Sequence, residues 1–262
     1  TKVVFQTYGV FVQQLLREPE LPGVGAVLLD EFHERTLECD LALAWVKALR
    51  QVSRPDLKAV VMSATLAAED LGRYLPQAVK IDVPGRLFDV DIRHQPMDAR
   101  REPADGALEA LRALAREGLD GSVLVFMPGL REIRRTMTVL APYCREQDLE
   151  LLALHANLDL NEQQKALKDS PRRRVIVSTN VAETGLTIPQ VRMVIDSGLH
   201  RVAGYDAARG INTLYLSRIS RGNAAQRAGR AGRTAPGRCV RLWSKSEEPG
   251  MAEGLMPEIL RL

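Results

Sequence analysis

The sequence predicts an α/β protein made of two parallel-sheet units in succession. Apolar, strand-like runs alternate with helical segments along most of the 262 residues, which is the pattern of parallel sheets covered by helices. The alternation pauses at Pro84-Gly85 and then starts again. A content of 45% hydrophobic and 26% charged residues indicates a globular chain with a buried core.

The first unit is expected to alternate strands and helices. Its first helix has an apolar face at Phe11, Val12, Leu15 and Leu16 and ends before Pro19. Helices between the strands allow the strands to run parallel. The expected strands are 3–7, 24–29, 58–62 and 79–83, and the expected helices are 8–18, 37–50 and 67–75.

The second unit repeats the pattern from residue 88. Pro128 and Gly129 stand where a helix can begin, and either Asn161 or Asp159 could cap another helix. The expected strands are 90–95, 122–127, 149–154, 172–178, 193–196, 212–217 and 237–243, and the expected helices are 104–117, 130–140, 161–168 and 220–230. Residues 247–262 read as the opening of a further helical element.

Charge and cysteine content bear on partners and compartment. A net charge of +3 permits a nucleic-acid partner and does not require one, and a GC-rich genome would explain the many arginines equally well. Cys39, Cys144 and Cys239 lie far apart without metal-ligand spacing, so a reducing cytoplasmic compartment is expected. Neither a membrane span nor a signal peptide is expected, because no apolar run reaches about 18 residues.

Residues 27–35, Val-Leu-Leu-Asp-Glu-Phe-His-Glu-Arg, carry the clearest chemical signal. An apolar strand ends in two adjacent carboxylates, at the edge of an α/β sheet where ligands bind. There Asp30 can orient a hydrated Mg²⁺ on a nucleotide, and Glu31 can accept a proton from an attacking water. The alternative is a solvated acidic turn, which is what a bare Asp-Glu pair usually is.

Three other segments place hydroxyl groups at strand ends. Ser63-Ala64-Thr65 could bond the acidic motif, although a plain turn is the simpler interpretation. Within residues 175–187, a buried strand ends in Ser-Thr-Asn, which could bind phosphate or simply cap a helix. Thr7-Tyr8-Gly9 could hold a phosphate at a helix start and is a weak signal alone.

The fourth feature is an arginine repeat over residues 226–233, Gln-Arg-Ala-Gly-Arg-Ala-Gly-Arg. A spacing of three residues on a helix is expected to keep these arginines on one face. Arginine stays charged and suits the stabilisation of a transferring γ-phosphate. A solvated basic face is the alternative, but two glycines inside a helix are unfavourable without a reason.

Taken together and in this order, the motifs resemble those of superfamily 2 helicases of the DEAH/RHA group. They are Thr-x-Gly, Asp-Glu-x-His-Glu-Arg, Ser-Ala-Thr, Thr-Asn-x-Ala-Glu-Thr and Gln-Arg-Ala-Gly-Arg-Ala-Gly-Arg. With Phe32, the acidic motif is similar to that of the bacterial HrpB-type ATP-dependent RNA helicases. The resemblance implies two RecA-like lobes of a P-loop NTPase helicase core. Residues 1–87 would be the C-terminal part of the first, 88–246 the second, and 247–262 the start of a winged-helix region.

The resemblance also implies roles in using ATP, or another nucleoside triphosphate, with Mg²⁺. Asp30 and Glu31 would hold the metal through water, with Glu31 as general base. His33, Ser63 and Thr65 would link the nucleotide site to the facing lobe.

The second lobe would complete this site. Gln226 would position the lytic water, Arg227 would contact the nucleotide, and Arg230 and Arg233 would be arginine fingers. The resemblance implies translocation along single-stranded RNA, or RNA with a 3′ overhang, with DNA as an alternative. The residues that would contact the RNA backbone are Thr7, Gly9, Thr179 and Asn180.

The sequence also departs from the family pattern. It contains no Gly-Lys pair, so the phosphate-binding loop Gly-x-x-x-x-Gly-Lys-Ser/Thr is expected upstream of Thr7 in a longer parent protein. Gly185 stands where many relatives have Ser, Pro189 where many have an acid, and Leu167 near a base-stacking position. Two hypotheses follow: the middle of an RNA helicase that is inactive by itself, or a module that only binds nucleic acid.

Overall fold

The computed structural model describes residues 2–64, 68–83, 85, 88–98, 100–206, 208–254 and 256–261. Thr65, one of the predicted site residues, lies outside them. The chain divides into two compact units. The first comprises Thr1–Ile81, Ala203–Thr213 and Leu255–Leu262, and the second comprises Asp82–Val202 and Leu214–Gly254.

The first unit is built on two parallel strands, β1 (Ala26–Leu29) and β2 (Lys58–Val61), paired in register from Ala26 opposite Lys58. Three helices accompany them: α1 (Tyr8–Arg17), α2 (Leu37–Val52) and α3 (Ala68–Tyr74). Alternate strand residues Val27 and Leu29 are buried in the core that α1 and α2 share. The three helix predictions are therefore confirmed, although Leu16 of the predicted apolar face is exposed.

Two strand predictions for this unit are wrong. Residues 3–7 and 79–83 have irregular backbones, and Phe5 and Val79 are 93% and 85% exposed. Their β-prone residues find no neighbouring strand in the described part of this unit, and without a ladder of hydrogen bonds an extended segment gains little. The outward face of the two-stranded sheet, at Leu28 and Val60, is likewise exposed.

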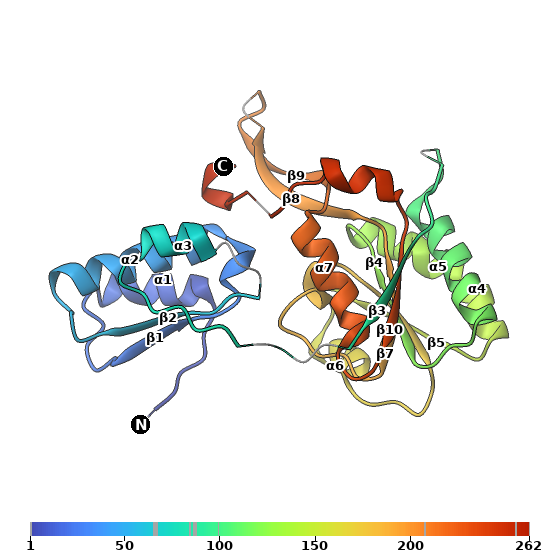
Figure 1. The fold of residues 1–262 in the computed structure, drawn as a ribbon, viewed down its shortest axis with the longest axis horizontal. Coiled ribbons are helices and arrows are strands. Elements are labelled where there is room, and N and C mark those ends of the chain that lie inside the picture. The colour runs from blue at the N-terminus through green and yellow to red at the C-terminus, as the bar shows by residue number, and fades with distance from the viewer. Residues whose placement is uncertain are drawn as a thin grey trace. The chain divides into compact units, whose positions relative to one another are not determined.

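The second unit contains a six-stranded, all-parallel sheet in the order β3-β10-β7-β4-β6-β5 (Figure 1). Helices α4 and α5 cover one face of it, and α6 and α7 cover the other. The elements are β3 (Val90–His94), α4 (Pro103–Arg116), β4 (Ser122–Phe126), α5 (Leu130–Glu146), β5 (Glu150–Leu154), α6 (Leu160–Leu167), β6 (Arg174–Ser178), β7 (Val191–Asp196), α7 (Arg221–Gly229) and β10 (Gly237–Arg241).

Burial of the central strands explains why their sequences are apolar throughout. Every residue of β4 and β6 is buried, as expected for a parallel sheet covered on both faces. Along β4, Val123 and Val125 pack towards the α4–α5 side, and Leu124 and Phe126 pack towards the α6–α7 side. These strands match the predicted ones to within two residues.

Three details differ from the sequence predictions. Helix α5 continues past the predicted end to Glu146 despite Pro142, and its last turns bury Leu140 and Cys144 against the core. Strand β8 (Leu199–Asp206) was not predicted, because its charged residues and Gly204 break the apolar alternation; it pairs with β9 (Ile211–Arg218). The tail forms only short 3₁₀ turns, at Lys245–Gly250 and Glu258–Leu260.

Candidate functional site

The acidic motif lies at the carboxyl end of β1. Asp30 follows the strand with an exposed side chain, and its Oδ1 accepts a hydrogen bond of 2.8 Å from the Glu31 amide. Its backbone carbonyl accepts from the Tyr8 hydroxyl at 2.5 Å. Burial raises the pKa of Tyr8, so the phenol stays protonated as a donor. The loop that presents the carboxylates is thereby fastened to α1.

Glu31 itself adopts the left-handed backbone conformation, with φ of 51°. This conformation is unfavourable for residues other than glycine and is often retained where function requires it. A short 3₁₀ turn, Phe32–Glu34, follows and ends at Arg35, which is left-handed too. Phe32 is buried in the core, and its amide donates to Met62 O at 3.0 Å. The buried phenyl ring therefore anchors the turn between the strand and α2.

His33 connects the acids to the segment after β2. Its Nδ1 accepts a hydrogen bond of 3.3 Å from the amide of Ala64, so the proton lies on Nε2. Nε2 is 3.5 Å from Oε2 of Glu31. The structure thus brings Glu31 and His33 together with the Ala64 backbone, and the predicted bond from the hydroxyls of Ser63 and Thr65 stays a prediction.

Thr7 and Gly9 lie at the start of α1. The Thr7 hydroxyl accepts a hydrogen bond of 3.4 Å from the Val10 amide and caps the helix, a role that was not predicted for it from the sequence. Both residues are exposed, and a side chain at Gly9 would meet no atom within 4 Å. The surface at this helix start is therefore open to a ligand.

In the second unit, Thr179 and Asn180 follow β6. Because Phe126 pairs with both Ser178 and Asp196, the carboxyl ends of β4, β6 and β7 reach the same edge of the sheet. Ser178 is committed to the fold, since its buried hydroxyl donates to Leu154 O at 2.8 Å. Thr179 is half-buried and Asn180 exposed, so these two side chains remain at the surface.

Arg227, a predicted nucleotide contact, lies in the interior of the second unit. Its side chain is fully buried beneath α7, where it donates to Glu183 Oε2 at 2.8 Å and to Asp196 Oδ1 at 3.0 Å. Its guanidinium also lies 4.9 Å from the centre of the Phe126 ring. Arg227 therefore belongs to the core of the second unit, and its predicted contact with the nucleotide stays a prediction.

The arginine repeat does not share one face. Helix α7 ends at Gly229, so Arg230 begins a 3₁₀ turn and Arg233 follows that turn. Arg230 is nearly buried and donates through Nε to Glu183 O at 2.8 Å, and through Nη1 to Leu186 O. Arg233 is exposed and donates to Thr187 Oγ1 at 2.7 Å. Gln226 is half-buried on α7.

Comparison with known proteins identifies the family. Residues 106–235 match the helicase conserved C-terminal domain family. Over its whole length the chain is 41% identical to the ATP-dependent RNA helicase HrpB of Escherichia coli. The crystal structure of Escherichia coli DEAH/RHA helicase HrpB superposes on 97% of the chain with a TM-score of 0.90 and 41% sequence identity. The chain belongs to the DEAH/RHA helicase family.

This helicase chain is also 38% identical to the human probable ATP-dependent RNA helicase DHX34 and 35% identical to the Escherichia coli ATP-dependent RNA helicase HrpA, over its full length in both cases. It spans 32% of the length of HrpB, 24% of DHX34 and 20% of HrpA. The predicted family and the RecA-like parallel sheet are confirmed.

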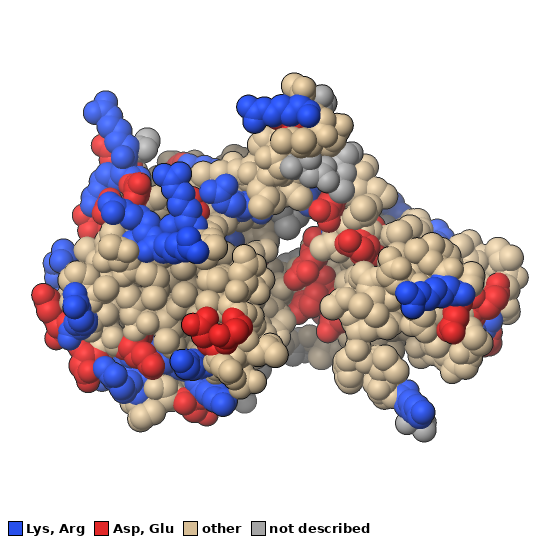
Figure 2. All heavy atoms as spheres, turned by 180° about the vertical axis from the view of Figure 1, so that it is seen from behind, with Lys and Arg blue, Asp and Glu red and all other residues tan. Residues whose placement is uncertain are grey.

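The second unit carries a surface feature that the sequence did not indicate. A pocket of about 450 Å³ lies among the starts of α4 and α5 and the base of the β8–β9 hairpin, lined by Arg131, Arg135, Leu199 and Leu216 among others. Basic side chains gather over part of the second unit (Figure 2). Arg131 and Arg135 are exposed on α5, which begins just after β4, at the same sheet edge as Thr179. Only the fold places these residues together.

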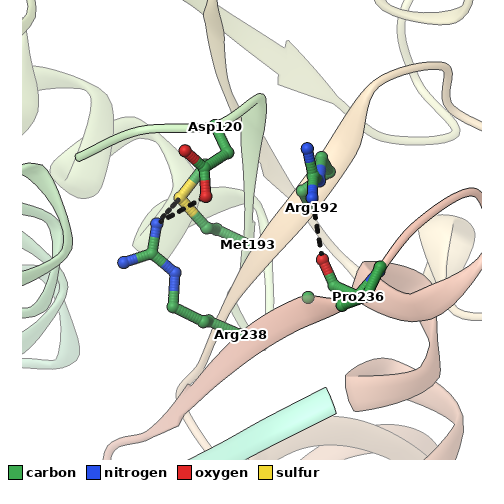
Figure 3. A pocket seen from close by; sticks show the side chains of 6 residues that line it. Asp120, Arg192, Met193, Pro236 and Arg238 are labelled. Atoms are coloured by element: carbon green, nitrogen blue, oxygen red, sulfur yellow. Dashed lines mark hydrogen bonds and ion pairs between the residues drawn. The ribbon is translucent and has the colours of Figure 1, made fainter. Parts of the chain in front are cut away.

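A smaller pocket, of about 220 Å³, lies at the opposite edge of the sheet, at the amino ends of β4, β7 and β10 (Figure 3). In it, Arg238 is 3.6 Å from Asp120, and Arg192 donates to Pro236 O at 3.2 Å. Pockets that bind small ligands are typically larger, about 300–1,000 Å³. Because both arginines already have partners within the lobe, this pocket is assigned a structural role.

The carboxylates at the end of β1 are of a kind that can bind a hydrated magnesium ion. Among the described residues no group of three or more His, Cys, Asp or Glu side chains could hold a metal ion. Mg²⁺ commonly uses one or two carboxylates together with water and substrate phosphates. The exposed Asp30 carboxylate, with Glu31 beside it, suits that mode. No helix in the described part of the chain has the length and apolar character needed to cross a membrane.

Proposed function

We propose that the chain is part of the catalytic core of an ATP-dependent RNA helicase, in which nucleoside triphosphate hydrolysis drives movement along single-stranded RNA. The observation that carries this proposal is the acidic group at the end of β1. Asp30, Glu31 and His33 are held there by a strand end, a left-handed residue and a hydrogen bond from Ala64. Relatives named as ATP-dependent RNA helicases match the whole chain.

Each residue of the first unit has a chemical part in this proposal. Asp30 holds the hydrated Mg²⁺ of the nucleotide, which neutralises developing phosphate charge. Glu31 accepts the proton of the attacking water. His33 connects Glu31 to the segment after β2, so that a shift of that segment would reorient Glu31. Together with Ser63 and Thr65, it is proposed to link the nucleotide site to the facing lobe. ATP is the proposed nucleotide, and other nucleoside triphosphates are open alternatives.

The second unit supplies positive charge and the nucleic-acid contacts. Arg230 and Arg233 stabilise the transferring γ-phosphate, and Gln226 orients the lytic water. Thr179 and Asn180, together with Thr7 and Gly9 of the first unit, contact the sugar-phosphate backbone of RNA. The exposed Arg131 and Arg135 add charge at the sheet edge that carries Thr179. RNA with a 3′ overhang is the proposed substrate, and DNA is the alternative to test.

The cytoplasm is the proposed compartment. Cys39, Cys144 and Cys239 are buried, unpaired thiols, as a reducing environment favours.

A nucleic-acid-binding function without hydrolysis is the second candidate for the 262-residue chain itself. It is favoured by the absence of any Gly-Lys pair from the sequence, since a phosphate-binding loop requires one. The two candidates make opposite predictions for hydrolysis once such a loop is present.

Arg233→Ala in the complete gene product tests the proposed function. Loss of an arginine finger lowers kcat by about 10³-fold or more. RNA affinity without nucleotide should stay unchanged, because Arg233 is proposed to act on the phosphate. Arg209→Ala, an exposed arginine in the turn of the β8–β9 hairpin, is the matched control and should keep kcat. An Arg233→Ala enzyme with the kcat of the wild type would contradict the proposal.

A further inference from the structure

One buried residue, Glu183, accepts hydrogen bonds from three side chains of α7 and the turn after it. Its Oε1 accepts from Asn223 Nδ2, and its Oε2 accepts from Arg227 Nε at 2.8 Å. Its backbone carbonyl accepts from Arg230 Nε at 2.8 Å. These three partners stand at positions i, i+4 and i+7, which form one stripe along a helix. Glu183 therefore fixes how α7 is rotated about its axis.

Rotation of α7 matters because the arginine fingers follow it directly. Arg230 begins the 3₁₀ turn that continues α7, and Arg233 follows that turn. In an α-helix each residue is separated from the next by about 100° of rotation and 1.5 Å of rise. A small rotation of α7 would therefore carry both guanidinium groups away from a fixed phosphate. The stripe centred on Glu183 resists that rotation.

Glu183 also stands in the middle of the segment from Thr179 to Thr187. The segment begins with the proposed RNA contacts, Thr179 and Asn180. It ends where Leu186 O accepts from Arg230 and Thr187 Oγ1 accepts from Arg233 at 2.7 Å. Only a few residues thus separate the RNA contacts from the groups that hold the arginine fingers, and the buried carboxylate anchors the segment between them.

We propose that Glu183 is a positioning residue that sets the arginine fingers relative to the RNA-contacting end of its own segment. The proposal rests on the proposed function, because it assigns Arg230 and Arg233 to the transferring phosphate. Glu183 touches neither RNA nor nucleotide in this role. It acts through α7, and it makes the geometry of the fingers depend on the segment that begins at Thr179.

Glu183→Gln in the complete gene product tests the proposal. Glutamine keeps the shape of the side chain, but its amide nitrogen must face a donor on Asn223 or Arg227, so one pairing is lost. Misplacement of a catalytic group by about 1 Å can cost about 100-fold in rate, so we expect RNA-stimulated kcat to fall about 10- to 100-fold. RNA affinity without nucleotide should change by less than about threefold. Asn223→Ala, which spares the ion pair with Arg227, should lower kcat less.

A second measurement tests positioning directly. It compares the affinity for ADP with aluminium fluoride, which mimics the transferring phosphoryl group, with the affinity for ADP alone. Glu183→Gln should weaken the affinity for ADP with aluminium fluoride and leave the affinity for ADP alone unchanged. The control is Glu248→Gln, which removes another partly buried carboxylate of the same unit that pairs with Arg241 at 2.5 Å and with His94 at 2.8 Å. Both variants are assayed well below their unfolding temperatures.

The outcomes separate this proposal from the function on which it rests. If Glu183→Gln keeps full kcat while Arg233→Ala loses it, the positioning role is refuted and the proposed function stands. A parallel loss of RNA affinity, ADP affinity and kcat would show a merely structural role and also refute it. A wild-type protein without RNA-stimulated hydrolysis would overturn the proposed function itself.

Discussion

Replacing Arg227 by methionine should destabilise the second unit strongly. Methionine retains the length and apolar stem of the side chain, so little cavity forms. It removes the charged group that donates to Glu183 at 2.8 Å, to Asp196 at 3.0 Å and to Leu199 O at 3.2 Å. Breaking a buried ion pair by deleting one partner costs about 3–5 kcal/mol. Since whole domains are stable by only about 5–15 kcal/mol, this is a large fraction.

Urea unfolding of the 262-residue chain measures this change. In a Trp45→Phe background the remaining tryptophan, Trp243, is buried in the second unit and reports on it alone. Arg238→Met is the matched control, because its carboxylate partners Glu117 and Asp120 are 43% and 64% exposed. Such exposed pairs contribute about 0–1 kcal/mol.

The pH dependence of the Arg227→Met variant adds an independent check. Burial raises the pKa of the Asp196 carboxyl, and Arg227 opposes that rise, so its removal should raise the pKa further. A carboxyl whose pKa is higher in the folded state binds its proton more readily when folded, so lowering the pH favours folding. The difference in unfolding free energy between the wild type and the variant should therefore become smaller as the pH falls from about 7 to about 5.

Two results would refute this reasoning about Arg227. A loss no larger than that of Arg238→Met would show that the buried cluster contributes little. A variant of the complete gene product that is stable but has a raised KM for ATP would instead support the nucleotide contact that the family resemblance implies for Arg227.

Three further predictions concern the chain as it stands. The 262-residue chain should not hydrolyse nucleoside triphosphates, because its sequence contains no Gly-Lys pair for a phosphate-binding loop. Any residual hydrolysis should be unaffected by Glu31→Gln. Activity sensitive to that change would contradict this. Its RNA binding should weaken steeply between about 50 and 200 mM salt, since phosphate contacts dominate, and salt-insensitive binding would indicate base recognition instead. Ellman's reagent should react slowly with the native thiols, because burial raises the pKa of Cys39 and Cys144 to about 11, and rapid colour formation would count against their burial.

Apolar runs in the sequence predicted strands correctly where the strand is buried on both faces of the sheet. The apolar runs that became β4 and β6 are buried on both faces, so nearly every residue carries the same signal. The strand end at Asp30 was predictable for a similar reason, because an apolar run stops at two charges. Residues 3–7 carry equally strong β-propensity and form no strand, since pairing depends on neighbours that propensity does not report.

The arginine repeat shows what spacing alone could not provide. The three arginines look equivalent in sequence, yet Arg227 is fully buried, Arg230 is nearly buried and Arg233 is exposed. Their partners lie far away in the chain: the carboxylates of Glu183 and Asp196 for Arg227, backbone carbonyls for Arg230 and the Thr187 hydroxyl for Arg233. Glu183 itself carried one signal that was available: an acid beside an alanine, in a segment that follows a buried strand. Only the fold revealed its three partners.

At position 31, the left-handed backbone favours glycine for stability, whereas the proposed activity requires glutamate. Glycine adopts this conformation freely, whereas other residues pay about 1 kcal/mol or more. Glu31→Gly would relieve that strain and remove the carboxylate proposed as general base. Selection for thermal stability alone would therefore favour glycine at position 31, and that protein would lack the proposed general base. A glutamate that persists in so unfavourable a backbone conformation is better explained by the chemistry of its side chain than by the fold.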